Sequence, residues 1–237
     1  MTTNFYAPPS AFRGSRVVLP EDEGRHVRSV LRARTGDEIV VVDGEGGWHR
    51  VTIDHLSSEQ VVGMVQETRR NVGEPDVHLT VGFGLLTKRS RFETFVEKAV
   101  ELGVRRIVPL QTAHTETDTF RYDRTRNVMI AALKQCRRSW LPELAKPKTL
   151  ASLLDASEAD HRLVCHGSED APSVFEALDG GAEARILTLV GPEGGFSAAE
   201  VEEAVGAGCT PVSLGPRRLR AETAGIATAT AVLMHCE

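Results

Sequence analysis

Short apolar runs separated by polar turns fill the first seventy residues of the chain. This pattern predicts β-strands over 16–19, 38–42, 48–56 and 60–66. Residue pairs that are typical of turns, such as Gly36-Asp37, separate these strands. One stretch, 21–32, instead has helical spacing, with an expected apolar face of Val27, Val30 and Leu31. We interpret this region as a small β-barrel with a helical insert.

From residue 77 the pattern changes to alternating strands and helices. Strands are predicted over 77–86, 106–110, 162–166, 185–190 and 211–214, and helices over 91–102, 124–138, 173–178, 198–207 and 222–234. Alternation of this kind is typical of an α/β fold with a parallel sheet covered on both faces. The polar segment 71–75 is interpreted as the linker, which predicts two domains, 1–72 and 73–237.

The charge balance narrows the possible partners. The net charge is -5, which argues against nucleic-acid binding by bulk electrostatics. A local basic cluster could still grip phosphates, but composition alone, with three acidic residues at 21–23, favours a solvated helix face. Its members are Arg13, Arg16, Arg25, Arg28 and Arg32.

Other classes of protein are excluded by missing patterns. No apolar run reaches the roughly 18 residues of a membrane span, and residues 1–10 do not resemble a signal peptide, so a cytoplasmic protein is expected. The four cysteines are widely spaced and predict free thiols rather than a metal site. No nucleotide-binding P-loop and no G-x-S-x-G elbow occurs, and Gly82-x-Gly84 lacks the third glycine of a dinucleotide fingerprint.

Two loops remain as candidate sites. The first, 191–196, is a Gly-Pro-Glu-Gly-Gly-Phe turn between a predicted strand and a helix, whose start is marked by the capping-box pair Ser197 and Glu200. The second, 214–224, places several arginines beside the apolar Leu219. Both follow strands, where α/β folds place ligands. Each is either a tight turn or a ligand site, and the concentrated charge of the second loop favours binding of a polar substrate.

Taken together, these motifs resemble the ribosomal RNA small subunit methyltransferase E family. The resemblance covers the whole chain: the two loops above are joined by Lys88, Arg91, Lys98 and Glu101, by Gln135, Arg138 and Pro142, and by an N-terminal pattern that includes His26 and Arg32. Two features depart from the family pattern, namely Arg218, where an aliphatic residue is more usual, and the segment 114–118.

The resemblance implies a PUA-like β-barrel followed by a SPOUT domain with a deep trefoil knot, and a homodimer formed through that domain. It implies S-adenosylmethionine as methyl donor and 16S rRNA, or the small ribosomal subunit, as partner, with N3 of a uridine methylated. The alternatives are a ribosome-assembly factor of the same fold and a methyltransferase acting on another RNA.

The resemblance also implies site residues. The cofactor-binding set is His166, Gly167, Gly191, Pro192, Glu193, Gly194, Gly195, Leu214, Gly215, Leu219 and Ala224. Lys88 and Arg91 join the five arginines of the basic cluster as candidates for holding RNA phosphates.

Three residues are candidates for the chemistry. N3 of uracil carries a proton that leaves during methylation, so a carboxylate near the pocket is a candidate base. Glu222 is the first choice, with a helix-capping role as the alternative, and Glu193 is the second. Arg220 could stabilise negative charge on a uracil carbonyl oxygen.

Overall fold

The structure is a computed structural model that describes residues 4–117, 119–166, 171–178 and 184–236. It separates into two compact units, Met1–Glu74 with Ile130–Leu141, and Pro75–Met129 with Pro142–Glu237. The division falls within helix α3 (Tyr122–Cys136). Within the described ranges, no helix has the length and apolar character needed to cross a membrane.

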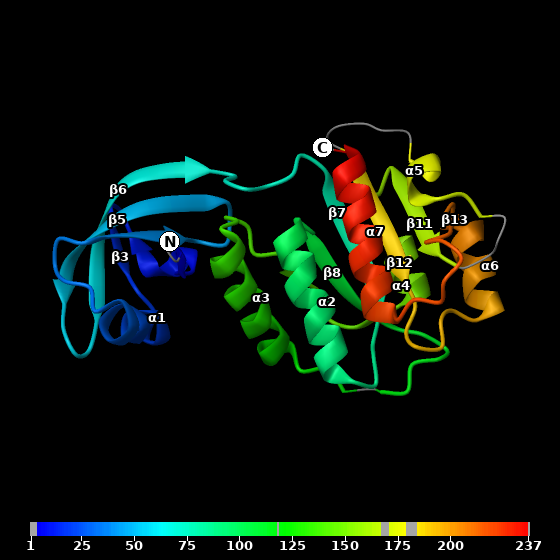
Figure 1. The fold of residues 1–237 in the computed structure, drawn as a ribbon, viewed down its shortest axis with the longest axis horizontal. Coiled ribbons are helices and arrows are strands. Elements are labelled where there is room, and N and C mark those ends of the chain that lie inside the picture. Colours follow the sequence, from blue (N-terminus) through cyan, green and yellow to red (C-terminus); the bar gives the residue numbers. More distant parts are fainter. Residues whose placement is uncertain (1–3, 118, 167–170, 179–183, 237) are drawn as a thin grey trace. The chain divides into compact units, whose positions relative to one another are not determined.

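The first unit is a six-stranded sheet, coloured blue to cyan in Figure 1. Its strands lie in the order β1-β4-β5-β6-β3-β2, and all pairs are antiparallel except β1 with β4. They are β1 (Asn4–Tyr6), β2 (Phe12–Arg13), β3 (Arg16–Val18), β4 (Glu38–Val42), β5 (Gly47–Leu56) and β6 (Val61–Arg70). β1 and β2 end the order without pairing to each other, and the described strands form a small curled sheet, in agreement with the predicted PUA-like β-barrel unit.

The helical insert differs from its prediction. Helix α1 (Glu21–His26) passes into a π-helical turn, Val27–Leu31, and Arg32 ends it in the left-handed conformation with φ of 52°. The wider π turn does not keep the 3.6-residue period, so the predicted apolar face does not form. Val27 is buried, but Val30 and Leu31 are 68% and 44% exposed.

The carboxylate of Glu74 joins Ile130–Leu141 to the first unit. It accepts hydrogen bonds from Nε and Nη2 of Arg138 at 3.0 and 2.7 Å, and from the backbone N–H groups of Ser139 and Trp140, both at 2.9 Å. The Glu74 and Arg138 side chains are almost fully buried. Because a buried charge is costly unless its polar atoms are bonded, this set of bonds stabilises the packing of Ile130–Leu141 on the first unit.

The second unit contains a seven-stranded, entirely parallel sheet. The order is β10-β8-β7-β12-β11-β13, with β9 paired to β8. The strands are β7 (His78–Gly84), β8 (Arg106–Gln111), β9 (Glu143–Leu144), β10 (Lys148–Thr149), β11 (His161–Cys165), β12 (Arg185–Val190) and β13 (Thr210–Val212). The predicted parallel sheet is therefore confirmed, and β12 has the predicted bounds.

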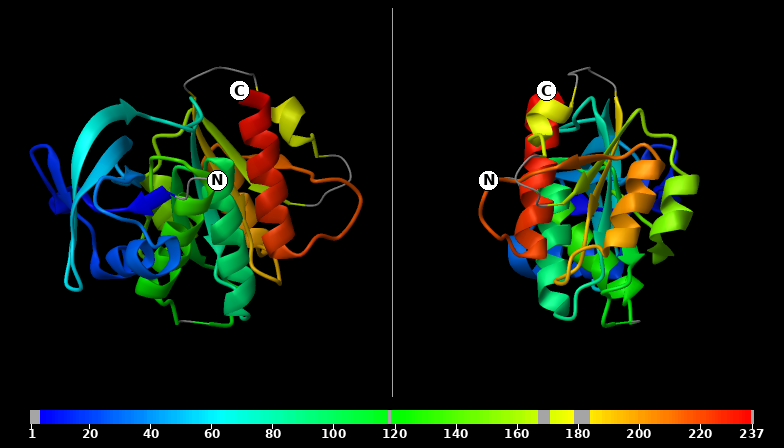
Figure 2. Two further views of the ribbon diagram at one scale, coloured as in Figure 1. Left: turned by 60° about the vertical axis from the view of Figure 1, so that its left-hand side comes forward. Right: turned by 90° about the vertical axis from the view of Figure 1, so that its right-hand side faces the viewer.

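Helices cover both faces of this sheet, as Figure 2 shows. On one face α2 (Arg89–Leu102) packs against α7 (Ala221–Cys236), whose Gly225 lies against the stacked rings of Phe83 and Phe95. On the other face α4 (Leu150–Asp155) and α6 (Ala198–Gly206) bury a cluster that includes Leu110 and Leu187. A short helix, α5 (Val174–Ala177), packs beside α7. The small side chains of α7 thus permit close packing, as predicted.

Candidate functional site

A cavity of about 630 Å³ lies at the carboxyl ends of the parallel strands. Its lining comes from the carboxyl ends of β11, β12 and β13, from the loops that follow them, from the first turn of α7 and from Arg91 of α2. The carboxyl edge of a parallel sheet is where α/β folds bind ligands, and a volume of this order suits a small-molecule ligand.

The loop after β12 has a tightly fixed backbone. The N–H of Gly195 donates to the carbonyl of Pro192 at 2.9 Å, which closes a turn. A Cβ on Gly191 would lie 2.8 Å from the carbonyl carbon of Gly195, so the loop has no room for a side chain there. The loop ends at Ser197, whose side chain and that of Glu200 form the predicted capping box at the start of α6. The result is a cradle of backbone groups.

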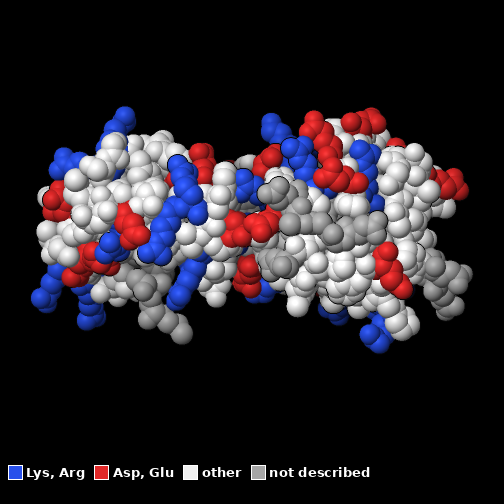
Figure 3. Space-filling view, turned by 90° about the horizontal axis from the view of Figure 1, so that it is seen from above, with Lys and Arg blue, Asp and Glu red and all other residues white. Residues whose placement is uncertain are grey.

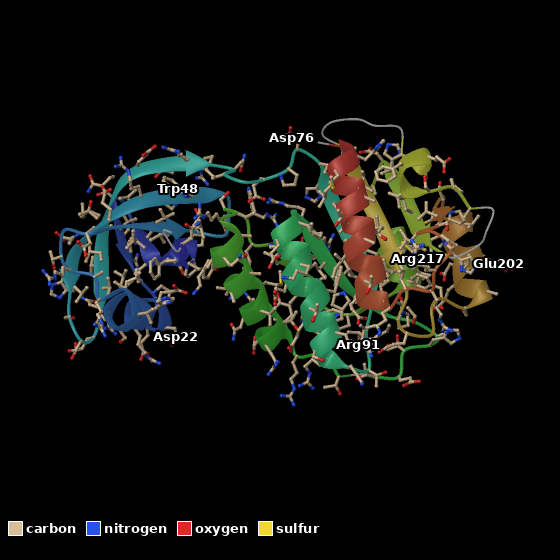
Figure 4. All side chains as sticks on the ribbon, in the orientation of Figure 1. Asp22, Trp48, Asp76, Arg91, Glu202 and Arg217 are labelled. Atoms are coloured by element: carbon tan, nitrogen blue, oxygen red, sulfur yellow. The ribbon has the colours of Figure 1, made fainter. Side chains whose placement is uncertain are left out.

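The segment between β13 and α7 instead offers side chains. Arg217, Arg218 and Arg220 line the cavity and are exposed, and within the described residues none of them forms an ion pair. Figure 4 labels Arg217 together with Arg91, which approaches from α2. The unpaired guanidinium groups of Arg217, Arg218 and Arg220 give the pocket a positive edge suited to an anionic partner.

Glu222 lies next to this edge, in the first turn of α7, but is not part of the lining. Its Oε1 is 3.6 Å from Nε of Arg91, and its Oε2 is buried without a hydrogen-bond partner among the described residues. A separation of 3.6 Å is an ion pair and not a hydrogen bond. Glu222 therefore retains unused hydrogen-bonding capacity behind the pocket wall.

Cys165 contributes an unreactive thiol to the wall. Its Sγ lies 3.1 Å from Oγ1 of Thr228, whose hydroxyl donates to the carbonyl of Ala224 at 2.8 Å. Because that hydroxyl proton is engaged, the thiol must be the donor of the first bond. Burial raises the pKa of Cys165 to about 11, so at neutral pH the side chain is a thiol and not a nucleophilic thiolate.

The structure brings together every described member of the predicted cofactor-binding set. They are His166, Gly191, Pro192, Glu193, Gly194, Gly195, Leu214, Gly215, Leu219 and Ala224, while Gly167 lies outside the described residues. Arg220 joins them in the lining. The prediction did not include Phe196 or Ala221 in this set, because neither carries a polar group that would mark a binding residue.

The predicted RNA-binding residues do not form one group. Arg91 lines the cavity, whereas Lys88 precedes α2 outside it. In the first unit, Arg16 pairs with Asp54 at 3.1 Å and Arg25 with Glu21 at 3.0 Å. Exposed pairs of this kind are weak, so both guanidinium groups can exchange their partners for a phosphate.

The remaining members of the basic cluster are less uniform. Arg13 is exposed on β2, Nη1 of Arg28 is buried, and Arg32 ends the π turn. On the face shown in Figure 3, Lys and Arg side chains lie among Asp and Glu side chains and form no continuous basic field. Among the described residues, no group of three or more His, Cys, Asp or Glu could hold a metal ion.

Comparison with known proteins assigns both units. Residues 73–233 match the model of an RNA methyltransferase domain, and residues 19–63 match that of an RNA methyltransferase PUA domain. The chain is 30% identical over 229 residues to ribosomal RNA small subunit methyltransferase E of Synechocystis, a match that covers 94% of this chain and 75% of the relative.

Two solved structures extend the likeness. The ribosomal RNA small subunit methyltransferase E of Neisseria gonorrhoeae, bound to S-adenosylmethionine, is 26% identical with a TM-score of 0.89 and covers 99% and 98% of the two chains. A putative methyltransferase of Legionella pneumophila, also with that cofactor, is 28% identical with a TM-score of 0.86 and covers 99% and 97%. The predicted SPOUT-type parallel sheet with a preceding PUA-like domain is confirmed. This chain belongs to the RNA methyltransferase family, in its ribosomal RNA small subunit methyltransferase E branch.

Proposed function

We propose that this protein transfers the methyl group of S-adenosylmethionine to N3 of a specific uridine in 16S rRNA of the small ribosomal subunit. The observation that carries the proposal is the cavity at the strand ends, which unites the predicted cofactor residues on one side with unpaired arginines on the other. The relatives reported above support the substrate class and the cofactor.

The pocket fits the cofactor on chemical grounds. Its volume of about 630 Å³ suits a nucleoside-sized ligand, and the Gly191 turn leaves backbone groups free of side chains. Leu214 and Leu219 supply apolar walls for an aromatic base. When bound, S-adenosylmethionine supplies an activated methyl group. The protein's task is to align uracil N3 with that group and to exclude water.

We assign the stabilisation of negative charge on the uracil to an arginine and the removal of the N3 proton to a carboxylate. Arg220 stabilises the negative charge that develops on a uracil carbonyl oxygen as the N3 proton leaves. We assign Glu222 as the acceptor of that proton, because one of its oxygens is unbonded and the other lies beside the pocket residue Arg91. Glu193 is the second candidate, because it lines the cavity and is exposed. The bond to N3 forms as the sulfur–carbon bond breaks, and the proton goes to the carboxylate.

Cations of each unit are the candidates for holding the RNA partner. We assign Arg13, Arg16, Arg25, Arg28 and Arg32, with Lys88 and Arg91, to phosphate contacts. The target uridine has to be single-stranded or flipped out, since N3 is used in base pairing inside a helix. This activity places the protein in the cytoplasm, where the small subunit is assembled.

A homodimer through the second unit completes the proposal. Helix α7 leaves a strip of small and apolar residues partly exposed, formed by Thr223, Ile226, Ala227, Thr230, Ala231 and Met234. A second copy packed on this strip would cover Met234, which is 73% exposed. Sedimentation of wild-type protein and of Met234→Arg tests it: a dimer that becomes a monomer supports the strip as the interface, and an unchanged dimer contradicts it. The trefoil knot stays a prediction, since strand order alone does not fix how the chain threads.

The function is tested on cellular RNA and on the purified protein. In a strain lacking the gene, 16S rRNA should lose one methyluridine, and the wild-type gene should restore it. An RNA that is still modified would contradict the substrate assignment. Calorimetry with S-adenosylmethionine should show binding heat, whereas a protein that serves only in ribosome assembly would show none.

A further inference from the structure

The segment that follows β8 is closed into a compact turn. The N–H of Thr112 donates to Oγ1 of Thr115 at 2.9 Å, and the N–H of Thr115 donates to the carbonyl of Thr112 at 3.0 Å. These bonds hold the two intervening residues, Ala113 and His114, in one conformation.

His114 reaches the glycine loop of the pocket from this turn. Its Nδ1 lies 3.1 Å from the carbonyl oxygen of Gly194 and 3.2 Å from that of Gly195. Carbonyl oxygens only accept, so Nδ1 carries the proton and donates to both. A Cβ on Gly194 would lie 2.8 Å from Cβ of His114, which means that the two backbones approach as closely as a glycine allows.

A second bond fixes the other end of the same loop. The N–H of Ala113 donates to Oε1 of Glu200 at 2.8 Å. The other oxygen of Glu200, Oε2, accepts from the N–H and Oγ of Ser197 at 2.8 and 3.0 Å, within the capping box of α6. One carboxylate therefore ties the start of α6 to the turn after β8, and His114 ties the glycines just before it.

The contact with the Gly195 carbonyl controls where one N–H donor of the loop points, because the N–H of Gly195 itself is already bonded to Pro192. A peptide unit is planar and trans, so a carbonyl held toward His114 directs the N–H of the same unit the opposite way. For the carbonyl of Gly195 that N–H belongs to Phe196, and both residues line the cavity. His114 itself is not part of the lining, so its effect on a bound ligand passes through the loop.

We propose that His114 is a positioning residue for the methyl donor. By donating a hydrogen bond to the carbonyls of Gly194 and Gly195, it holds the loop 191–196 in the conformation that binds the cofactor. The inference rests on the proposed function, because it presumes that this loop binds S-adenosylmethionine. It adds a determinant of cofactor affinity that lies eighty residues away in the chain.

Three variants of the full-length protein distinguish the effect of the hydrogen-bond donor of His114 from the effect of its side-chain shape. Asn carries an N–H donor at the same number of bonds from the backbone as Nδ1, whereas an ionised Asp of the same shape can only accept and would oppose the two carbonyls. We expect His114→Asn to bind S-adenosylmethionine within about twofold of wild type, and His114→Ala to bind about three- to tenfold more weakly, as the loss of one net hydrogen bond predicts. His114→Asp should bind more weakly still.

The measurement is calorimetric titration with S-adenosylmethionine, with the melting temperature of the ligand-free protein recorded in parallel. His55→Asp, at an exposed histidine of β5, controls for added negative charge and should bind like wild type. Equal affinity of His114→Asn and His114→Asp, or wild-type affinity of His114→Ala, would overturn the role of His114 alone. A melting temperature that falls in step with affinity would assign His114 to general stability and also overturn it. No binding heat with the wild-type protein would remove both the proposed cofactor and this inference.

Discussion

The two loops that line the pocket are built in opposite ways. The loop after β12 uses backbone: it is closed by a turn bond from Gly195 to Pro192, capped by Ser197 and buttressed by His114. The segment after β13 uses side chains, with Arg217, Arg218 and Arg220 exposed and unpaired among the described residues. A cofactor of constant shape is served by a rigid surface, while an RNA chain is served by mobile cations that find phosphates. Damage to the first should affect cofactor affinity, and damage to the second should affect catalysis and RNA binding.

The largest effect is expected at Gly191. Its new Cβ in Gly191→Ala would press on the backbone of Gly195 and Phe196, and backbone cannot move aside as a flexible side chain does. We expect S-adenosylmethionine affinity to fall by about a hundredfold or more, measured by calorimetry. Gly206→Ala in α6 is the matched control, because a Cβ there meets nothing within 4 Å. Equal losses in both variants would show that the rigid loop is not what binds the cofactor.

At Glu222 the expected loss is in rate and not in cofactor affinity. Glu222→Ala should slow methyl transfer about tenfold or more at saturating cofactor, as the loss of a general base predicts. Glu222→Gln keeps the size but not the charge, and should be slowed to a similar extent. Glu202→Ala, on the exposed face of α6 labelled in Figure 4, is the control for removal of a carboxylate. Near-normal single-turnover rates for Glu222→Ala would move the assignment to Glu193.

The wall between the two loops should respond to pH through Cys165. Burial raises the pKa of this thiol from 9.0 to about 11, so the folded state keeps the proton to higher pH than the unfolded chain does. The stabilisation is therefore complete below about pH 9 and is lost as the pH rises toward 11. Between pH 8 and pH 10 the free energy of unfolding should fall by about 1 kcal/mol less in Cys165→Ala than in the wild-type protein, as measured by urea denaturation. Identical pH profiles for the variant and wild type would show that the thiol is not sequestered.

The smallest effect is expected from the arginine loop, because each exposed guanidinium contributes little alone. Arg217→Ala and Arg218→Ala should each weaken RNA binding about threefold and flatten its salt dependence, without changing cofactor affinity. Arg185→Ala is the control, since that residue begins β12 at the strand end opposite the pocket. If the control weakens RNA binding as much, the loop has no special role in holding RNA.

Local patterns predicted much of the fold. Ser197 and Glu200 predicted the start of α6, because a capping box is formed by residues three positions apart. Apolar runs bounded by turns predicted β12 and the parallel sheet. The pattern failed at Val30 and Leu31, where a π turn replaces the helical period. It also missed α4 and the two-residue strands β9 and β10, which are too short to show a period.

The candidate site, like the fold, could be predicted only where its residues lie close together in the sequence. Its two loops could be found because each carries its own chemistry within a dozen residues. The pairing of Arg91 with Glu222 and the contact of His114 with Gly194 join residues far apart in the chain, so no spacing rule reaches them. Likewise, Arg138 is marked by the family pattern, but only the structure shows it buried against Glu74.

The pairing of β7 with β12 limits how early the parallel sheet can form while the chain is being synthesised. Partners such as Phe83 and Val190 are separated by more than a hundred residues, so a ribosome working at about 5–20 residues per second needs roughly five to twenty seconds to supply the second strand. During that interval Val81 and Phe83, both fully buried in the finished sheet, can pair with β8 on one edge of β7 but lack β12 on the other. The pocket is complete only when Ala224 has been synthesised, so the methyl donor can stabilise the finished chain but cannot assist the nascent one.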